Sequence, residues 1–306
     1  MFPIIYSDAF LDHDTGHFHP ESPQRLEAIV NALKTVSWSD RLQWQKPTNL
    51  AQRNPIPYIK NIHMDNYIKG VQRLAEKGGG FIDGDTIVSP ESYNVALLAV
   101  NAWLDGVDTV LTTQQPAFVL SRPPGHHAVQ KTGMGFCLFS NAAIAAHYAL
   151  QCDGIQRVAI VDWDVHHGNG TQAIVEDNPN IAYCSLHQFP AYPGTGTATE
   201  TGKYDNVLNI PMEPGSDLNH YQVAFEQQVI PFLERFHGDF LIVSAGYDAN
   251  QADPLASINL QPRDYGIFTQ QLLTVTSRIL FGLEGGYDLS ALAESVVATI
   301  EVCLSQ

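Results

Sequence analysis

The sequence predicts a single α/β domain with a central, mainly parallel sheet flanked by helices, and three observations support this fold class. Short apolar runs alternate with longer amphipathic segments, which is the pattern of βαβ units. The chain has 306 residues, 44% of them hydrophobic, enough for one large domain with a substantial core. No internal repeat, low-complexity tract or linker divides the chain. We therefore expect one domain over residues 1–306, with right-handed crossovers that cover both faces of the sheet.

Seven short apolar runs are predicted strands, because buried strands of a parallel sheet read as continuous hydrophobic stretches. They cover residues 2–6, 117–121, 157–162, 181–186, 206–210, 239–245 and 278–283. The predicted helices cover residues 90–105, 140–151, 217–236, 264–277 and 289–304. Pro90 favours a helix start, and Asp217 and Ser290 are candidate N-caps. Segments 41–65 and 187–204 are rich in Pro, Gly and polar residues, so we expect loops there.

The composition narrows the classes of partner and the compartment. The formal net charge of −16 weighs against a general affinity for nucleic acid or anionic membranes. The four cysteines have no CxxC spacing and are expected to be reduced, mostly buried side chains. The N-terminus lacks the basic region of a secretion signal, and no apolar run reaches the ~20 residues that span a bilayer. We therefore expect a cytoplasmic protein with no direct nucleic-acid or membrane partner.

Polar segments rich in His, Asp and Gly directly follow four of the predicted strands. They are Arg-Pro-Pro-Gly-His-His at 122–127, Asp-Trp-Asp-Val-His-His-Gly-Asn-Gly-Thr at 162–171, Gly-Tyr-Asp-Ala-Asn at 246–250 and Glu-Gly-Gly-Tyr-Asp at 284–288. Ligands of open α/β sheets bind outside the carboxyl ends of the strands. We therefore expect these four segments to converge on one crevice, which would be a single active site.

Two carboxylates and one imidazole in these segments are candidate metal ligands. Asp164 and His166 occupy alternating positions and point to the same side if strand geometry persists. With Asp248 they make three protein ligands and leave a position for water, which is the catalytic arrangement of zinc. The oxygen-rich set also fits Mn²⁺, Co²⁺ or Fe²⁺, so the identity of the metal stays open.

The remaining polar groups suggest acid–base chemistry beside the metal. His126 and His127 offer general acid or base groups near neutral pH. Asp162 and Asn169 are left to orient those imidazoles. Tyr287 follows a glycine pair that lets the backbone approach the site, and its hydroxyl is expected to donate to a developing oxyanion.

Ordered motifs along almost the whole chain resemble the zinc-dependent histone deacetylase family. They lie at residues 122–128, 162–171, 185–187, 244–248, 253–255 and 283–287, and residues 19–26 resemble the N-terminal signature of that family. The resemblance runs from about residue 6 to the C-terminus. Asn169 and the Glu-Gly-Gly-Tyr form of the last motif are similar to the class II branch and its bacterial amidohydrolase relatives.

The resemblance implies the arginase/deacetylase fold, with a parallel sheet of about eight strands. It implies that Asp164, His166 and Asp248 bind zinc. It also implies that His127, paired with Asn169, is the general base and acid, and that His126, paired with Asp162, acts electrostatically. Tyr287 matches the oxyanion donor.

The resemblance also implies a tunnel for an acyl-lysine side chain and two further sites. Gly135, Phe136 and Tyr192 match tunnel walls, and Leu255 lies near the rim. Arg25 matches the arginine of an internal cavity below the metal, where it assists the exit of acetate. Family members hold a structural K⁺ near the zinc, and the matching residues are Asp162, Asp164, His166, Ser185 and Leu186.

The expected activity is zinc-dependent hydrolysis of the N-ε-acetyl-lysine amide in a protein or peptide. Deacetylation of an acetylpolyamine is the nearest alternative and calls for a capping insertion, for which residues 60–90 are the only, rather short, candidate. A two-manganese ureohydrolase of arginase type needs further Asp or His ligands. A catalytically silent acyl-lysine binder is at odds with the presence of His127, Tyr287 and all three ligands. The sequence leaves the physiological substrate and the oligomeric state open.

Overall fold

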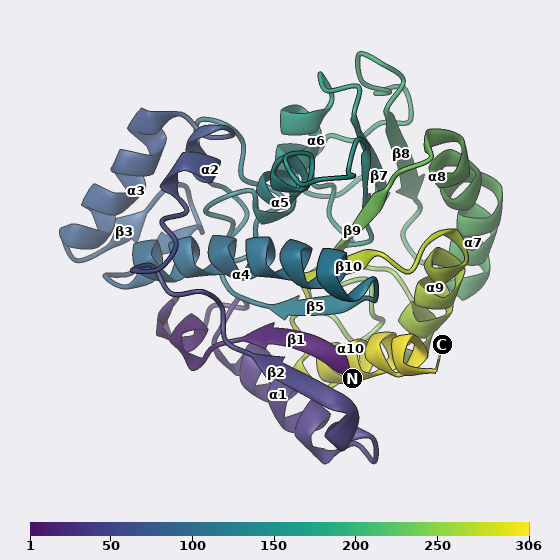
Figure 1. Cartoon of the computed structure of the whole chain (residues 1–306), viewed down its shortest axis with the longest axis horizontal. Coiled ribbons are helices and arrows are strands. Elements are labelled where there is room, and N and C mark those ends of the chain that lie inside the picture. The colour runs from purple at the N-terminus through teal and green to yellow at the C-terminus, as the bar shows by residue number, and fades with distance from the viewer. Residues whose placement is uncertain (306) are drawn as a thin grey trace.

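The computed structural model, which describes residues 1–305, is organised around an eight-stranded sheet whose strands are all parallel (Figure 1). The strand order is β2-β1-β5-β10-β9-β6-β7-β8. The strands are β1 (Phe2–Tyr6), β2 (Leu42–Gln45), β5 (Ala117–Leu120), β6 (Val158–Asp162), β7 (Ile181–Gln188), β8 (Val207–Met212), β9 (Phe240–Ala245) and β10 (Ile279–Leu283). A separate antiparallel hairpin joins β3 (Gly80–Phe81) and β4 (Ile87–Val88). The predicted fold class is confirmed.

Helices cover both faces of this sheet (Figure 1). Those that follow β2, β5 and β6 lie on one face, where α4 packs on β5 and β10 and α5 packs on β6 and β9. On the other face α10 packs between α1 and α9. The helices are α1 (Gln24–Thr35), α2 (Ile56–Lys60), α3 (Asp65–Glu76), α4 (Ser92–Thr113), α5 (Asn141–Ala149), α6 (Asn169–Val175), α7 (Leu218–Ala224), α8 (Ile230–Phe236), α9 (Pro262–Val275) and α10 (Leu289–Leu304).

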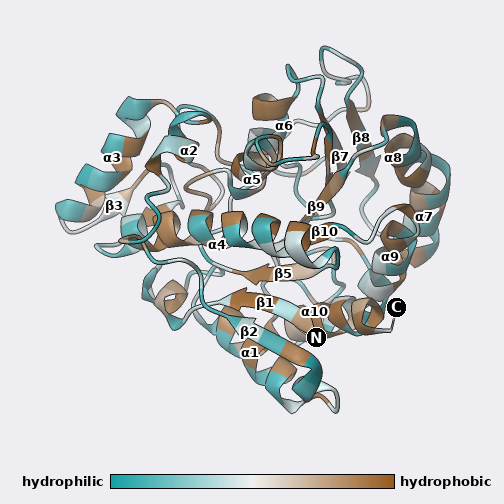
Figure 2. Cartoon of the chain, in the orientation of Figure 1, coloured by the Kyte–Doolittle hydropathy of each residue, from teal (hydrophilic) through white to brown (hydrophobic). Residues whose placement is uncertain are grey.

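The helix α4 is the central packing element of its face. By length and composition it is the one helix of residues 1–305 that could cross a bilayer, but 67% of its most apolar window is buried, as in a core helix. Its Trp103 packs against β10 at Gly282, where a Cβ atom would lie 2.1 Å from the indole ring. Figure 2 shows hydrophobic and hydrophilic bands alternating along α4, while β1 and β5, drawn below it in this view, are mostly hydrophobic. This amphipathic pattern positions α4 over the sheet.

The seven predicted strands are all present, and the structure adds elements that the sequence reading missed. One is β2, an edge strand inside the predicted loop 41–65. The predicted helix 217–236 is α7 and α8, joined by a π-helical turn at Phe225–Val229. Asp217 caps α7 as predicted, because its side chain accepts from two backbone N–H groups of the first turn. The prediction for Ser290 is wrong: it lies within α10, and Asp288 is the N-cap, accepting from the backbone N–H of Ala291 at 2.8 Å.

All four cysteines are free. Cys137, Cys184 and Cys303 are buried, and Cys152 is partly buried, as expected for thiols that pack as small hydrophobic side chains.

Candidate active site

The four polar segments converge because their strands are neighbours in the sheet. The strands β5, β10, β9 and β6 are adjacent, so their carboxyl ends form one edge although they are far apart in the chain. A pocket of about 260 Å³ opens at this edge. It is lined by Asp85, His127, Gly135, Phe136, His166, Tyr192, Leu255 and Tyr287. The single crevice predicted from the sequence is thus present.

Asp164, His166 and Asp248 form a compact group in which the ligand atoms all lie within 4.8 Å of one another. The Nδ1 atom of His166 is 3.1 Å from Oδ2 of Asp248 and 3.3 Å from Oδ1 of Asp164. Both carboxylates are fully buried, and within residues 1–305 neither pairs with a lysine or arginine. Two buried carboxylates side by side are costly unless a cation compensates them. The donor set therefore fits a divalent metal such as zinc.

Backbone groups orient the two carboxylates. Oδ2 of Asp164 accepts from the N–H of Gly285 at 2.8 Å, and Oδ1 of Asp248 accepts from the N–H of Val165 at 2.8 Å. The other oxygen of each carboxylate is left to face His166. Gly285 is required for this approach, since a Cβ atom there would lie 2.3 Å from Oδ2 of Asp248. Burial and the charge of Asp164 raise the pKa of Asp248 to about 6. A bound cation would offset both the burial of this carboxylate and its repulsion from Asp164.

The tandem histidines have the partners predicted for them. Nδ1 of His126 lies 3.1 Å from Oδ2 of Asp162, and Nδ1 of His127 lies 2.8 Å from Oδ1 of Asn169. Burial opposes the charged form of His126, but the charges of Asp164 and Asp162 outweigh it and raise its pKa well above the usual range. Burial and the neighbouring charge of His126 lower the pKa of His127 well below the usual range. These opposite shifts favour the cationic form of His126 and the neutral form of His127.

Tyr287 and the predicted tunnel residues line the pocket together. The ring of Phe136 lies edge-on to that of Tyr287, with centroids 5.9 Å apart. Tyr192 and Leu255 are 44% and 41% exposed, which places them at the mouth. Gly135 has φ +53°, and a Cβ atom there would lie 2.5 Å from the His127 ring, so only glycine fits. Burial raises the pKa of the Tyr287 hydroxyl well above its usual value, so the hydroxyl stays protonated and can donate.

Arg25 lies behind Tyr287 rather than in the pocket. It is fully buried, and its guanidinium carbon is 5.1 Å from the centroid of the Tyr287 ring. Its Nε and Nη2 atoms donate to the carbonyls of Gly286 and Glu284, and Nη1 donates to Glu21. These bonds brace the loop that carries Tyr287. A role in acetate exit stays a prediction.

The residues matched to a potassium site lie at and after the end of β6 and within β7, where Asp162 pairs in register with Ser185. Both carboxylate oxygens of Asp162 are already bonded, Oδ2 to His126 and to the hydroxyl of Tyr183, and Oδ1 to a backbone N–H. The Ser185 hydroxyl is bonded to Nδ1 of His187 at 2.8 Å. These contacts do not test the site, and K⁺ stays a prediction.

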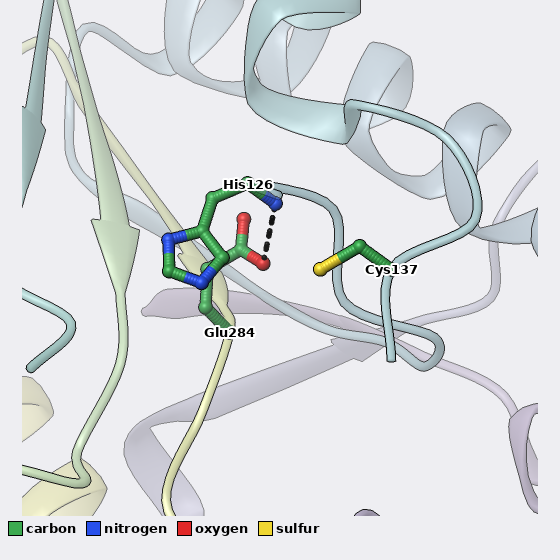
Figure 3. Close-up of side chains that lie close together, drawn as sticks. All are labelled: His126, Cys137 and Glu284. Carbon is green, nitrogen blue, oxygen red and sulfur yellow. Dashed lines mark hydrogen bonds between the residues drawn. The ribbon is translucent and has the colours of Figure 1, made fainter. Parts of the chain in front are cut away.

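The sequence reading missed two acidic residues of the site. Asp85 lines the pocket but belongs to the β3–β4 hairpin, away from the strand ends at which site residues are predicted. Glu284 is fully buried and lies within 4.8 Å of His126 and Cys137 (Figure 3). In the sequence, Glu284 could have been noticed as a carboxylate that directly follows a buried strand, but no role was predicted for it. This second group is unsuited to a metal, because hydrogen-bond donors already occupy both Glu284 oxygens and burial raises the pKa of the Cys137 thiol well above its usual value.

Comparisons with known proteins agree with this geometry. Residues 19–303 match the histone deacetylase domain. The protein slr0245 of Synechocystis sp. is 57% identical over 304 residues, which cover 99% of this chain and 100% of that protein. Histone deacetylase 14, chloroplastic, of Arabidopsis thaliana is 35% identical over 326 residues, covering 99% of this chain and 77% of that protein. The crystal structure of the HDA15 HD domain aligns with a TM-score of 0.93 at 34% identity, covering 100% of this chain and 90% of that chain. This chain therefore belongs to the histone deacetylase family and is a hydrolase.

Proposed function

We propose that the protein is a zinc-dependent deacetylase that hydrolyses the N-ε-acetyl-lysine amide of proteins or peptides. One observation supports this most: a group of two buried carboxylates and one imidazole lies beside His127 and Tyr287 at one apolar-walled pocket. Asp164, His166 and Asp248 would hold the zinc, for which Fe²⁺, Co²⁺ or Mn²⁺ could substitute. When bound, the metal would polarise the amide carbonyl and lower the pKa of water.

The protein groups would then divide the proton transfers between them. Because Nδ1 of His127 donates to Asn169, its Nε2 is the free acceptor and takes a proton from the attacking water. The Tyr287 hydroxyl donates to the oxygen that develops negative charge. His127, now protonated, passes its proton to the leaving amine. His126 would stay cationic between its carboxylate partners and favour the developing negative charge.

The pocket walls suit a neutral, linear acyl-lysine. Acetylation removes the lysine charge, so the stem can pass the rings of Phe136 and Tyr192 without a charged partner. Residues 60–90 form α3 and the β3–β4 hairpin, and of these only Asp85 lines the pocket, so no long insertion caps it. An uncapped mouth favours a polypeptide substrate.

An acetylpolyamine is the second candidate, because the Asp85 carboxylate at the mouth would attract its cationic remainder. Turnover of acetyl-lysine peptides and of acetylated polyamines by one preparation of measured metal content tests the choice. Higher kcat/KM for the peptides supports the proposal. Faster turnover of the polyamines would overturn it while leaving the deacetylase chemistry intact.

A further inference from the structure

We propose that Glu284 is a positioning residue that sets the tandem histidines against the metal ligands by holding the backbone of Gly125 and His126. One oxygen of the Glu284 carboxylate, Oε2, accepts from the N–H of Gly125 at 2.6 Å and from the N–H of His126 at 3.2 Å. Figure 3 shows the carboxylate close to the His126 backbone, with this second bond drawn. The proposal rests on the proposed function only for its kinetic readout.

The sheet order explains why this carboxylate can reach across. Glu284 directly follows β10, which lies between β5 and β9. On one side it holds the loop after β5, and on the other its Oε1 accepts from the hydroxyl of Ser244 on β9 at 2.8 Å. The carboxylate therefore ties together the carboxyl ends of three adjacent strands.

The His126 peptide is held from both directions. Its N–H donates to Glu284, and its C=O accepts from the backbone N–H groups of Gly170 and Thr171, each at 3.0 Å. Those two residues belong to the first turn of α6, which directly follows the segment carrying Asp164 and His166. Two sets of hydrogen bonds thus set the distance from the histidines to the candidate metal ligands. Glu284 provides one set, and the first turn of α6 provides the other.

The Glu284 carboxylate is the acceptor that the structure gives to both N–H groups. Glu284 is fully buried, and both of its oxygens are engaged by neutral donors rather than by a lysine or arginine of residues 1–305. The loop is tightly packed at Gly125, where even a Cβ atom would lie 2.6 Å from the backbone nitrogen of Asn141. Removing the carboxylate leaves two buried N–H donors without a partner, so the loop is expected to shift until they find one.

The test compares E284A and E284Q in the metal-loaded, full-length protein. E284A should lower kcat on an acetyl-lysine peptide by about 100-fold, since a displacement of the catalytic groups near 1 Å can cost this much, with little change in KM or metal content. In E284Q the amide oxygen can still accept both N–H bonds, and kcat should stay within about tenfold of the wild type. Equal losses in E284A and E284Q would overturn the proposal, because charge rather than position would then matter.

Two further measurements separate positioning from general destabilisation. Asp105 is the matched control, a carboxylate far from the pocket that also accepts a backbone N–H, from Thr48, and pairs with Arg53. D105A should lose stability yet keep kcat, and a loss of kcat in D105A equal to that in E284A would count against the proposal. Amide hydrogen exchange of residues 125–127 is independent of any substrate. The exchange should accelerate in E284A and not in E284Q or D105A. Unchanged protection in E284A would show that Glu284 does not hold this backbone, even if the protein proved inactive on acetyl-lysine.

Discussion

His127 donates from Nδ1 to the side-chain oxygen of Asn169 at 2.8 Å, and an amide cannot take that proton. The imidazole is therefore fixed in the tautomer whose Nε2 is free to accept a proton, as the proposed base requires. A carboxylate at the same place would instead favour the imidazolium form.

The first prediction concerns the pH dependence set by this pair. In N169D the negative charge should raise the pKa of His127, so the base form is reached only at higher pH. The acid limb of the kcat/KM profile should move upward, while the wild type, in which burial and His126 lower the pKa of His127, stays active below neutrality. A profile of N169D that coincides with the wild type would show that His127 is not the base.

The second prediction concerns Tyr287. Y287F removes the hydroxyl that is expected to donate to the oxyanion but keeps the ring packed against Phe136. Loss of one such donor costs about 10²–10³-fold in kcat. Steady-state kinetics should show this fall with a nearly unchanged KM and a full complement of metal. A Y287F enzyme as fast as the wild type would remove the hydroxyl from the mechanism.

The third prediction concerns the metal. Chelation should abolish turnover, and because a ligand that binds only the folded state stabilises it, the melting temperature should fall as well. Added zinc should restore both. D248N keeps the shape of the side chain but removes a charge from the ligand set, and it should bind metal weakly, by elemental analysis. Wild-type activity in D248N after chelation would contradict a role for the metal.

The fourth prediction concerns the buried charges at Glu21, which bonds to Arg122 through both carboxylate oxygens and to Arg25 at 3.0 Å. Burial alone would raise the pKa of Glu21, but the charges of Arg122 and Arg25 outweigh burial and lower it to about 2. Since the folded pKa lies below the ordinary value of 4.5, this contribution to stability is complete above pH 4.5 and is lost as the pH falls toward 2.

E21Q should destabilise the protein by about 3–5 kcal/mol, because two guanidinium groups are left buried without their counter-charge. Denaturant titrations of the wild type and E21Q across pH 2–5 measure both the destabilisation and its pH dependence. The wild type should lose more stability than E21Q as the pH falls through this window. Parallel curves would show that Glu21 does not titrate as its surroundings imply.

Much of the fold and the site could be predicted because the apolar runs and the polar segments after them are local in the sequence. The elements missed have weaker signals. β2 is an edge strand with one buried residue, Leu42, so it leaves no apolar run. In α3 the buried residues do follow a helical spacing, at Tyr67, Ile68, Val71 and Ala75, so that helix could have been found.

The missed functional residues depend on tertiary arrangement. Asp85 reaches the pocket only because the β3–β4 hairpin folds toward the strand ends. The contacts of Glu284 with Gly125 and Ser244 follow from the position of β10 between β5 and β9, an order that the chain sequence does not reveal. Spacing predicted two of the candidate metal ligands, Asp164 and His166, because they alternate on one segment, whereas Asp248 was predicted from its place after another strand.

The position of β10 also has a consequence for biosynthesis. It is the last strand of this sheet to be synthesised, yet it lies in the middle of the sheet and joins β2-β1-β5 to β9-β6-β7-β8. A nascent chain that stops before residue 279 has two half-sheets with no shared edge, and it lacks Tyr287. The candidate metal ligands are all synthesised by then, but the segment after β5 that carries His126 and His127 lacks its contact with Glu284. Catalytic competence should therefore arise in one late step, when the C-terminal segment closes the gap between the halves.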